Sequence, residues 1–200
     1  MTITHYCGGS VQTNGYIVDA PDGVLVIDAP DGIADKLRDL NLKPSAVLLT
    51  HQHFDHVEGA TELARMGAQV YAWNAYSHDL ILDQAAARWG LPIVVEPFTV
   101  NQTLEGSERL QIAGLDFELL HVPGHSPDSI VFALPDLAFT GDTIFAGSIG
   151  RPDLPGGDFE LLTRGIREKL LTLPADTRFL PGHGPETSPG TETASNPYFT

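Results

Sequence analysis

Three histidines and an aspartate crowd into one short segment of the chain, LLTHQHFDHVEG at residues 48–59. His51 and His53 are two positions apart and follow an apolar run, so in an extended chain their side chains point to the same side. Asp55 and His56 come next, where the chain turns. Histidine is the commonest protein ligand of metal ions at neutral pH, and aspartate supplies a hard oxygen ligand. The spacing therefore predicts a corner of the chain that can reach two adjacent metal ions.

Three further segments carry a histidine or an aspartate in a similar setting. They are HVPGHSPDS with His125, FTGDTIF with Asp142 and LPGHGPET with His183. Each of these residues follows an apolar run and is flanked by glycine, which allows a ligand to approach the backbone closely. Taken alone, residues 51–56 are also compatible with a polar loop that uses His and Asp for capping and solvation. Four such segments together favour a metal site.

Short strands and helices alternate along the chain and place these residues near strand ends. Strand patterns cover residues 11–19, 24–28, 46–50, 70–72, 109–112, 115–122, 129–134, 137–140 and 178–180. Apolar residues at helical spacing, together with capping signals, predict helices over residues 33–40, 57–66, 74–89 and 159–171. This alternation favours a layered α/β architecture. Because no repeat, low-complexity tract or linker interrupts it, we expect a single domain over residues 1–200.

Composition narrows the classes of partner. The formal net charge is −15, from 26 Asp and Glu against 11 Lys and Arg. Such a chain lacks the basic surface that neutralises phosphates, so we expect no nucleic-acid partner and no anionic membrane partner. No apolar run approaches the roughly 18 to 20 residues of a membrane span, and the first residues lack the layout of a signal peptide. We therefore expect a cytoplasmic protein.

The segments THQHFDH, PGHSPDS, TGDTIFAGSIGR and LPGHGPET resemble the metal-binding motifs of the metallo-β-lactamase superfamily in their order and spacing. The resemblance covers nearly the whole chain. It implies a four-layer αββα sandwich, in which two β-sheets pack face to face between outer helices and the metal site lies at one edge.

The resemblance also implies a ligand set for two divalent metal ions. The first ion would be bound by His51, His53 and His125 and the second by Asp55, His56 and His183, with Asp142 bridging the two. Two ions about 3.5–4 Å apart can hold a shared hydroxide of lowered pKa and polarise a substrate carbonyl. Asp55 would be catalytic, because it would orient this hydroxide and accept its proton. Zinc is the expected metal, and the same ligands suit iron or manganese.

Within the superfamily, GDTIFAGSIGRPDLPGGD and LLTLPADTRFLPGHGPET resemble most the glyoxalase II, or hydroxyacylglutathione hydrolase, branch. That resemblance implies hydrolysis of a small glutathione-type thioester to a hydroxy acid and a free thiol. A thiolate of pKa about 8.5 leaves without a strong general acid, and none is evident outside the ligands. The superfamily's true β-lactamases lack a bridging aspartate like Asp142, and its tRNA-processing nucleases rely on basic surface that this chain lacks.

The resemblance to glyoxalase II is incomplete in two places. Classical members carry a helical C-terminal extension that helps to bind glutathione, whereas only residues 184–200 follow the last motif histidine here. Those members also have a lysine and an aromatic residue after the GDT block, where this chain has Arg151 and, near the aromatic position, Asp153. We expect Arg151 to bind a substrate carboxylate. Pairing with Asp153 or Asp158 is its alternative role.

Other activities fit the same residues. In the superfamily's persulfide dioxygenases, a single iron is held by residues that match His51, His125 and Asp142, and this set is present here. A lactonase would use the same dinuclear site, and a binding or regulatory protein could keep the metals without catalysis. GDTIFAGSIGR and PGHGPET look more like the hydrolase branch, which favours thioester hydrolysis.

Overall fold

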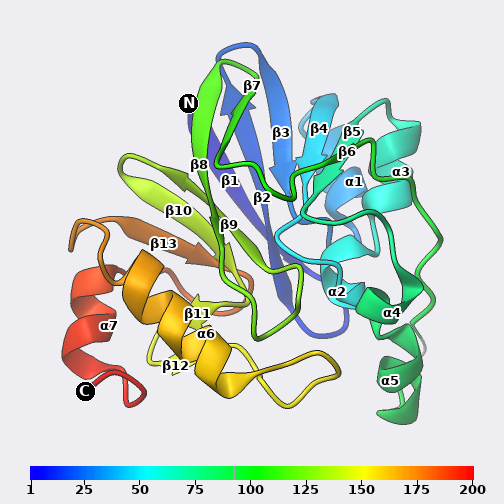
Figure 1. The fold of residues 1–200 in the computed structure, drawn as a ribbon. Helices are drawn as coiled ribbons and strands as arrows, with labels where there is room; N and C mark the ends of the chain where they lie inside the picture. The colour runs from blue at the N-terminus through cyan, green and yellow to red at the C-terminus, as the bar shows by residue number, and fades with distance from the viewer. Residues whose placement is uncertain (92) are drawn as a thin grey trace. The chain divides into compact units, whose positions relative to one another are not determined.

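A computed structural model describes residues 1–91 and 93–200 of the chain (Figure 1). These residues form two compact units. The first consists of Met1–Gly106 and Gln111–Leu115, and the second of Ser107–Leu110 and Asp116–Thr200. Each unit contains one large β-sheet with helices, so the predicted α/β alternation is confirmed.

The first unit is built on a six-stranded sheet in the order β1-β2-β3-β4-β5-β6. The strands are β1 (Thr2–Gly8), β2 (Thr13–Ala20), β3 (Gly23–Ile27), β4 (Pro44–Leu48), β5 (Gln69–Ala72) and β6 (Gln102–Thr103). The first three pair antiparallel, and the pairs from β3 to β6 are parallel. The strands expected at residues 11–19 and 24–28 are β2 and β3, which pair as an antiparallel hairpin. Strand β1 was not predicted, because none of its residues is buried and the segment gives little apolar signal.

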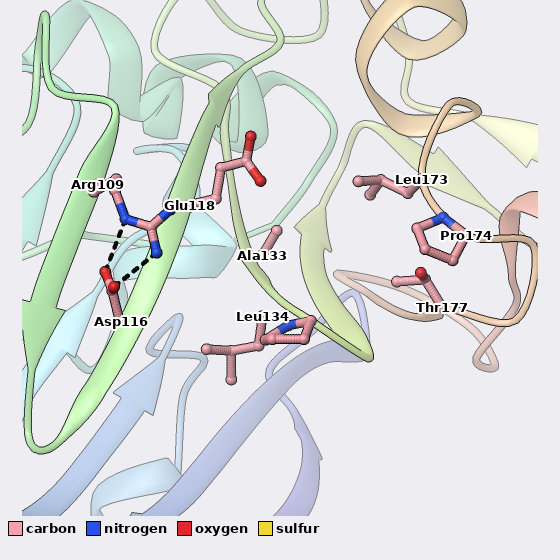
Figure 2. A pocket seen from close by; sticks show the side chains of 9 residues that line it. Arg109, Asp116, Glu118, Ala133, Leu134, Leu173, Pro174 and Thr177 are labelled. Atoms are coloured by element: carbon pink, nitrogen blue, oxygen red, sulfur yellow. Dashed lines mark hydrogen bonds and ion pairs between the residues drawn. The ribbon is translucent and has the colours of Figure 1, made fainter.

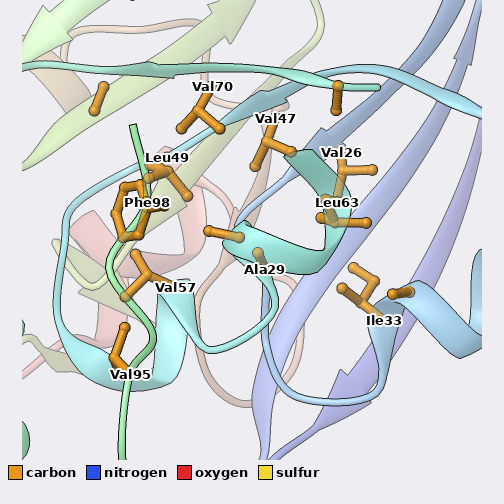
Figure 3. Packing of buried hydrophobic residues seen from close by; sticks show 14 of the residues in the cluster. Val26, Ala29, Ile33, Val47, Leu49, Val57, Leu63, Val70, Val95 and Phe98 are labelled. Carbon is orange, nitrogen blue, oxygen red and sulfur yellow. The ribbon is translucent and has the colours of Figure 1, made fainter. Parts of the chain in front are cut away.

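Helices of the first unit cover one face of this sheet. They are α1 (Ile33–Asp39), α2 (Phe54–Val57), α3 (Ala60–Arg65), α4 (His78–Ile81) and α5 (Asp83–Arg88). Val26, Val47 and Val70, one from each of three neighbouring strands, pack with Ile33 of α1 and Leu63 of α3 (Figure 3). Each such fully buried side chain contributes roughly 1.5–3 kcal/mol. This packing fixes the end of β4, from which the histidine-rich segment emerges.

Two helices expected from the sequence are interrupted. The helix expected over residues 57–66 is divided into α2 and α3, and α2 already contains Asp55 and His56. The division falls at Gly59, whose N–H donates to the carbonyl of Ala29 at 2.7 Å. A Cβ at Gly59 would lie 3.2 Å from that oxygen, so the close approach of the two segments favours glycine.

The helix expected over residues 74–89 begins only at His78 and is broken at Leu82, which has φ +59°. The buried Gln52 accounts for the late start. Its amide donates to the carbonyls of Asn74 at 3.4 Å and Ala75 at 3.2 Å, and its oxygen accepts from the N–H of Ser77 at 3.2 Å. These contacts hold residues 74–77 in a non-helical loop.

The second unit is built on a five-stranded sheet in the order β13-β10-β9-β8-β7, of which only the end of β7 and the first residue of β8, within Gln111–Leu115, belong to the first unit. Its elements are β7 (Arg109–Ile112), β8 (Leu115–His121), β9 (Ile130–Leu134), β10 (Leu137–Gly141), β13 (Arg178–Pro181), α6 (Phe159–Gly165), a π-helical segment (Ile166–Leu170) and α7 (Pro189–Ser195). A small hairpin of β11 (Ile144–Phe145) and β12 (Ser148–Ile149) lies between β10 and α6 in the chain. Leu162 and Ile166 pack against Val131, Ala138 and Phe179 of the sheet. The helix expected over residues 159–171 therefore exists, with a π-helical second half.

Among the described residues, no helix is both long and apolar enough to cross a membrane.

Candidate metal centre

The first unit brings its four predicted ligands together just beyond β4. His51, His53, Asp55 and His56 are all at most 6% exposed. His51 Nε2 lies 3.1 Å from His53 Nδ1, and His56 Nε2 lies 3.4 Å from Asp55 Oδ2. Two donors bound at about 2.1 Å to one tetrahedral ion lie about 3.4 Å apart. The predicted ligands of this unit therefore have the mutual spacing of metal ligands.

Asp28 orients His56 from the end of β3. Its Oδ2 accepts a hydrogen bond from His56 Nδ1 at 2.8 Å, and its Oδ1 accepts one from the N–H of Thr50 at 2.7 Å. With the proton held on Nδ1, the lone pair of His56 lies on Nε2, the nitrogen that faces Asp55. Asp28 adopts the left-handed backbone conformation, φ +56°, which aspartate and asparagine tolerate better than most residues.

The second unit brings its three predicted ligands together. His125 lies in the loop after β8, Asp142 directly follows β10, and His183 follows β13. Asp142 Oδ2 lies 3.5 Å from His125 Nε2 and 3.4 Å from His183 Nε2. His125 and Asp142 are buried, and His183 is partly exposed. One carboxylate oxygen thus faces two imidazole Nε2 atoms at the separation expected of ligands that share an ion.

The main chain orients His125. Its Nδ1 lies 2.9 Å from the carbonyl oxygen of Arg151, which accepts a hydrogen bond from Nδ1–H and so leaves the lone pair on Nε2. The preceding residue, Gly150, allows this approach, because a Cβ there would lie 1.8 Å from the carbonyl oxygen of Asp142. Its N–H donates to the carbonyl of Thr143 at 3.1 Å. Gly150 therefore fixes both the carbonyl that orients His125 and the segment that carries Asp142.

The donor set of both groups suits a divalent metal ion. It consists of imidazole nitrogens and carboxylate oxygens, a combination that binds zinc, iron or manganese. For His56 and His125, a hydrogen-bond acceptor at Nδ1 selects the tautomer that a metal ion needs at Nε2. The residues present therefore fit the metals that the sequence motifs imply.

Arg151 is the remaining predicted site residue, and its side chain is paired. Its Nε and Nη2 donate to the two carboxylate oxygens of Asp153 at 3.0 and 2.9 Å. The guanidinium holds the pKa of Asp153 below its ordinary value. Both side chains are about 60% exposed or more, so this pair contributes little to stability. Of the two roles expected for Arg151, the structure shows the pairing.

Glu58 is a charged residue whose setting the sequence did not reveal. Burial, followed by the carboxylates of Asp31 and Asp55, raises its pKa from 4.5 to about 7. Its Oε2 is buried and has no hydrogen-bond partner among the described residues. The first unit thus tolerates a carboxylate that is hard to ionise next to its histidine-rich corner.

A surface pocket of about 270 Å³ lies elsewhere in the second unit (Figure 2). Arg109 and Asp116 face each other on one side of it and form an ion pair at 2.7 Å. Leu134 and Pro174 form part of the apolar lining of this pocket. None of the described residues that line the pocket is a predicted metal ligand, so it is separate from the candidate site.

Comparison with known proteins identifies the family. Residues 8–183 match the family described as the Metallo-beta-lactamase superfamily, a match that extends over both compact units. The chain belongs to this superfamily. It is 38% identical over 203 residues to the probable metallo-hydrolase YqgX of Bacillus subtilis (strain 168), covering 96% of this chain and 94% of that protein. It is 39% identical over 172 residues to the hydroxyacylglutathione hydrolase GloC of Haemophilus influenzae, covering 84% and 81%.

Solved structures confirm the fold. The B3 metallo-beta-lactamase BLEG-1 is similar with a TM-score of 0.87 and 33% identity, over 100% of both chains. TTHA1623, solved in a di-iron-bound form, has a TM-score of 0.84 and 38% identity, over 98% of this chain and 99% of that one. The chain has the metallo-β-lactamase fold that its motifs implied.

Proposed function

We propose that the protein is a dinuclear metal-dependent hydrolase. In this proposal His51, His53 and His125 would hold the first ion and Asp55, His56 and His183 the second, and Asp142 would be the ligand shared by both. The observation that carries the proposal is donor spacing. In each unit, carboxylate oxygens and imidazole Nε2 atoms lie 3.4–3.5 Å apart, as two ligands of one ion do. Superfamily membership supports joining the two groups into one centre.

Hydrogen bonds within the chain hold two of these histidines in the tautomer that binds a metal ion. Asp28 and the carbonyl of Arg151 hold protons on Nδ1 of His56 and His125, which keeps their Nε2 atoms in the metal-binding form. When bound, two divalent ions supply a water of lowered pKa and polarise a substrate carbonyl. The carboxylate of Asp55 accepts the proton of the attacking water, and no serine or cysteine nucleophile is needed.

For the substrate we propose a small thioester of the glutathione type. The relative named hydroxyacylglutathione hydrolase supports this choice, as does the GDTIFAGSIGR segment. A thiolate is a good leaving group near neutral pH, which suits a site without a separate general acid. Arg151 would bind a substrate carboxylate only in exchange for Asp153, so its contribution to binding is small.

The test is thiol release from lactoylglutathione by the purified protein, with its metal content measured by elemental analysis. We expect two ions per chain and rapid thiol release. Asp142→Ala should lose the activity and at least one ion while the far-ultraviolet circular dichroism stays unchanged. Asp136→Ala, in an exposed turn of the same unit, is the matched control and should leave both unchanged.

The outcomes separate the alternatives. A protein that holds two ions but releases no thiol would refute the thioesterase and leave the metal centre standing. A single iron per chain, with oxygen consumed in the presence of glutathione persulfide, would identify a dioxygenase instead. Cleavage of a lactone but not of the thioester would identify a lactonase.

A further inference from the structure

Thr13 contacts Asp55 from the start of β2. Its side chain is fully buried, and its hydroxyl donates to Asp55 Oδ2 at 2.6 Å. The turn that precedes it is tight, with Gln12 in the left-handed conformation at φ +58°. On the neighbouring strand Thr13 pairs with Gly8. The start of β2 thus places the Thr13 hydroxyl against the Asp55 carboxylate, which also lies beside His56.

The contact restricts how the Asp55 carboxylate can turn. The oxygen that accepts the hydroxyl is also the one that lies 3.4 Å from His56 Nε2. A carboxylate oxygen has two lone pairs, so one can take the Thr13 hydroxyl while the other faces a metal ion. Threonine is β-branched and its χ1 angle is stiff, so the donor itself is held in place. Because the pair is buried, water does not compete for this hydrogen bond.

We propose that Thr13 is a positioning residue that holds Asp55 in the orientation in which it binds the second metal ion. This inference rests on the proposed function, which makes Asp55 a ligand of that ion. Hydrogen bonds to a ligand from outside the metal's own coordination shell typically account for a 10–100-fold effect on metal affinity. Thr13 acts through its hydrogen bond to Asp55.

The experiment measures metal binding rather than turnover. Metal-free wild type, Thr13→Val and Thr13→Ser are titrated with Zn²⁺ against a chromogenic chelator. Valine keeps the size and branching of threonine but removes the hydroxyl, whereas serine keeps the hydroxyl. We expect Thr13→Val to bind the second ion about 10–100-fold more weakly than wild type, and Thr13→Ser to stay within about threefold. The first ion should bind equally in all three.

Thr177→Val is the matched control, because it makes the same change at another buried threonine. Thr177 is 2% exposed, and its hydroxyl has no hydrogen-bond partner among the described residues. We expect the Thr177→Val protein to bind both zinc ions with the affinities of wild type. If Thr13→Val does not fold, as judged by circular dichroism, Thr13→Ala replaces it with a smaller side chain that also lacks the hydroxyl.

The results distinguish this inference from the function on which it rests. If wild type binds two ions and Thr13→Val binds the second one equally well, the positioning role is wrong and the dinuclear centre stands. An equal loss in Thr13→Val and Thr13→Ser would also overturn it, because the hydroxyl would then be irrelevant. If wild type itself binds fewer than two ions, the dinuclear proposal fails, and the role of Thr13 fails with it.

Discussion

Replacement of Asp28 by asparagine tests whether the tautomer of His56 controls metal binding. Asp28 and His56 are both buried, and their hydrogen bond is 2.8 Å long. Asparagine has nearly the same shape and tolerates the left-handed backbone of position 28. Its oxygen can still accept a hydrogen bond from the N–H of Thr50, which in the wild-type protein donates to Asp28 Oδ1 at 2.7 Å. Its amide N–H₂, however, then faces His56 Nδ1 and can only donate.

The magnitudes favour asparagine over alanine for this test. Donation from the asparagine amide would move the His56 proton to Nε2, where a metal ion must displace it, so the second ion should bind about 10–100-fold more weakly. Metal-free stability should fall by only about 1 kcal/mol, because one hydrogen bond changes partners. Asp28→Ala would instead take the acceptor from three buried donors, the N–H and hydroxyl of Thr50 and Nδ1 of His56, in a strained backbone. The cost would be roughly 4–11 kcal/mol, comparable to the total stability of a domain.

The assay combines zinc titration against a chelator with urea unfolding of the metal-free protein. We expect Asp28→Asn to separate the two readouts, with a large loss of affinity and a small loss of stability. Wild-type affinity for the second ion in Asp28→Asn would refute the reasoning. Catalytic activity, measured alongside, should fall in step with occupancy of the second ion.

Three other substitutions probe the site. Gly150→Ala forces a Cβ to within 1.8 Å of the Asp142 carbonyl oxygen, so metal content and thermal stability should both fall; a fully metallated, equally stable variant would contradict this. Glu58 has a folded-state pKa of about 7, above its unfolded value of 4.5, so ionisation destabilises the fold as pH rises between them. Metal-free Glu58→Gln should therefore gain about 1 kcal/mol at pH 8, after allowance for solvent screening, and nothing at pH 4 in urea unfolding; a pH-independent difference would count against it. Arg151→Ala should raise KM for an anionic thioester by less than about fivefold and leave kcat unchanged, because Asp153 already occupies the guanidinium; a large fall in kcat would assign Arg151 a different role.

The residues predicted as ligands stand out in the sequence because each is marked locally. His51, His125 and Asp142 all follow apolar strands, and glycines flank two of them. The orienting residues were harder to find. Asp28 also follows a strand, which is the signal that could have identified it, but its partner His56 is 28 positions away. Nothing in the sequence around Asp28 distinguishes it from the other acidic residues, 26 in all, as the partner of a distant histidine.

Contacts made by side chains far away in the chain also explain the wrong helix boundaries. Residues 74–89 have helical spacing, yet the hydrogen bonds of Gln52 hold the first four of them in a loop. The contact between Thr13 and Asp55 likewise joins positions 42 residues apart. Local propensity predicts which elements exist, whereas such tertiary hydrogen bonds decide where they begin and end.

Residue 151 makes separate contacts through its main chain and its side chain. The carbonyl oxygen orients His125, and a carbonyl is present whatever amino acid occupies the position. The guanidinium points to another partner, Asp153. Mutation at this position can therefore remove the ion pair with Asp153 while the carbonyl that orients His125 stays in place. Such a separation allows the side chain at this position to diverge among descendants of one protein without disturbing the orientation of His125.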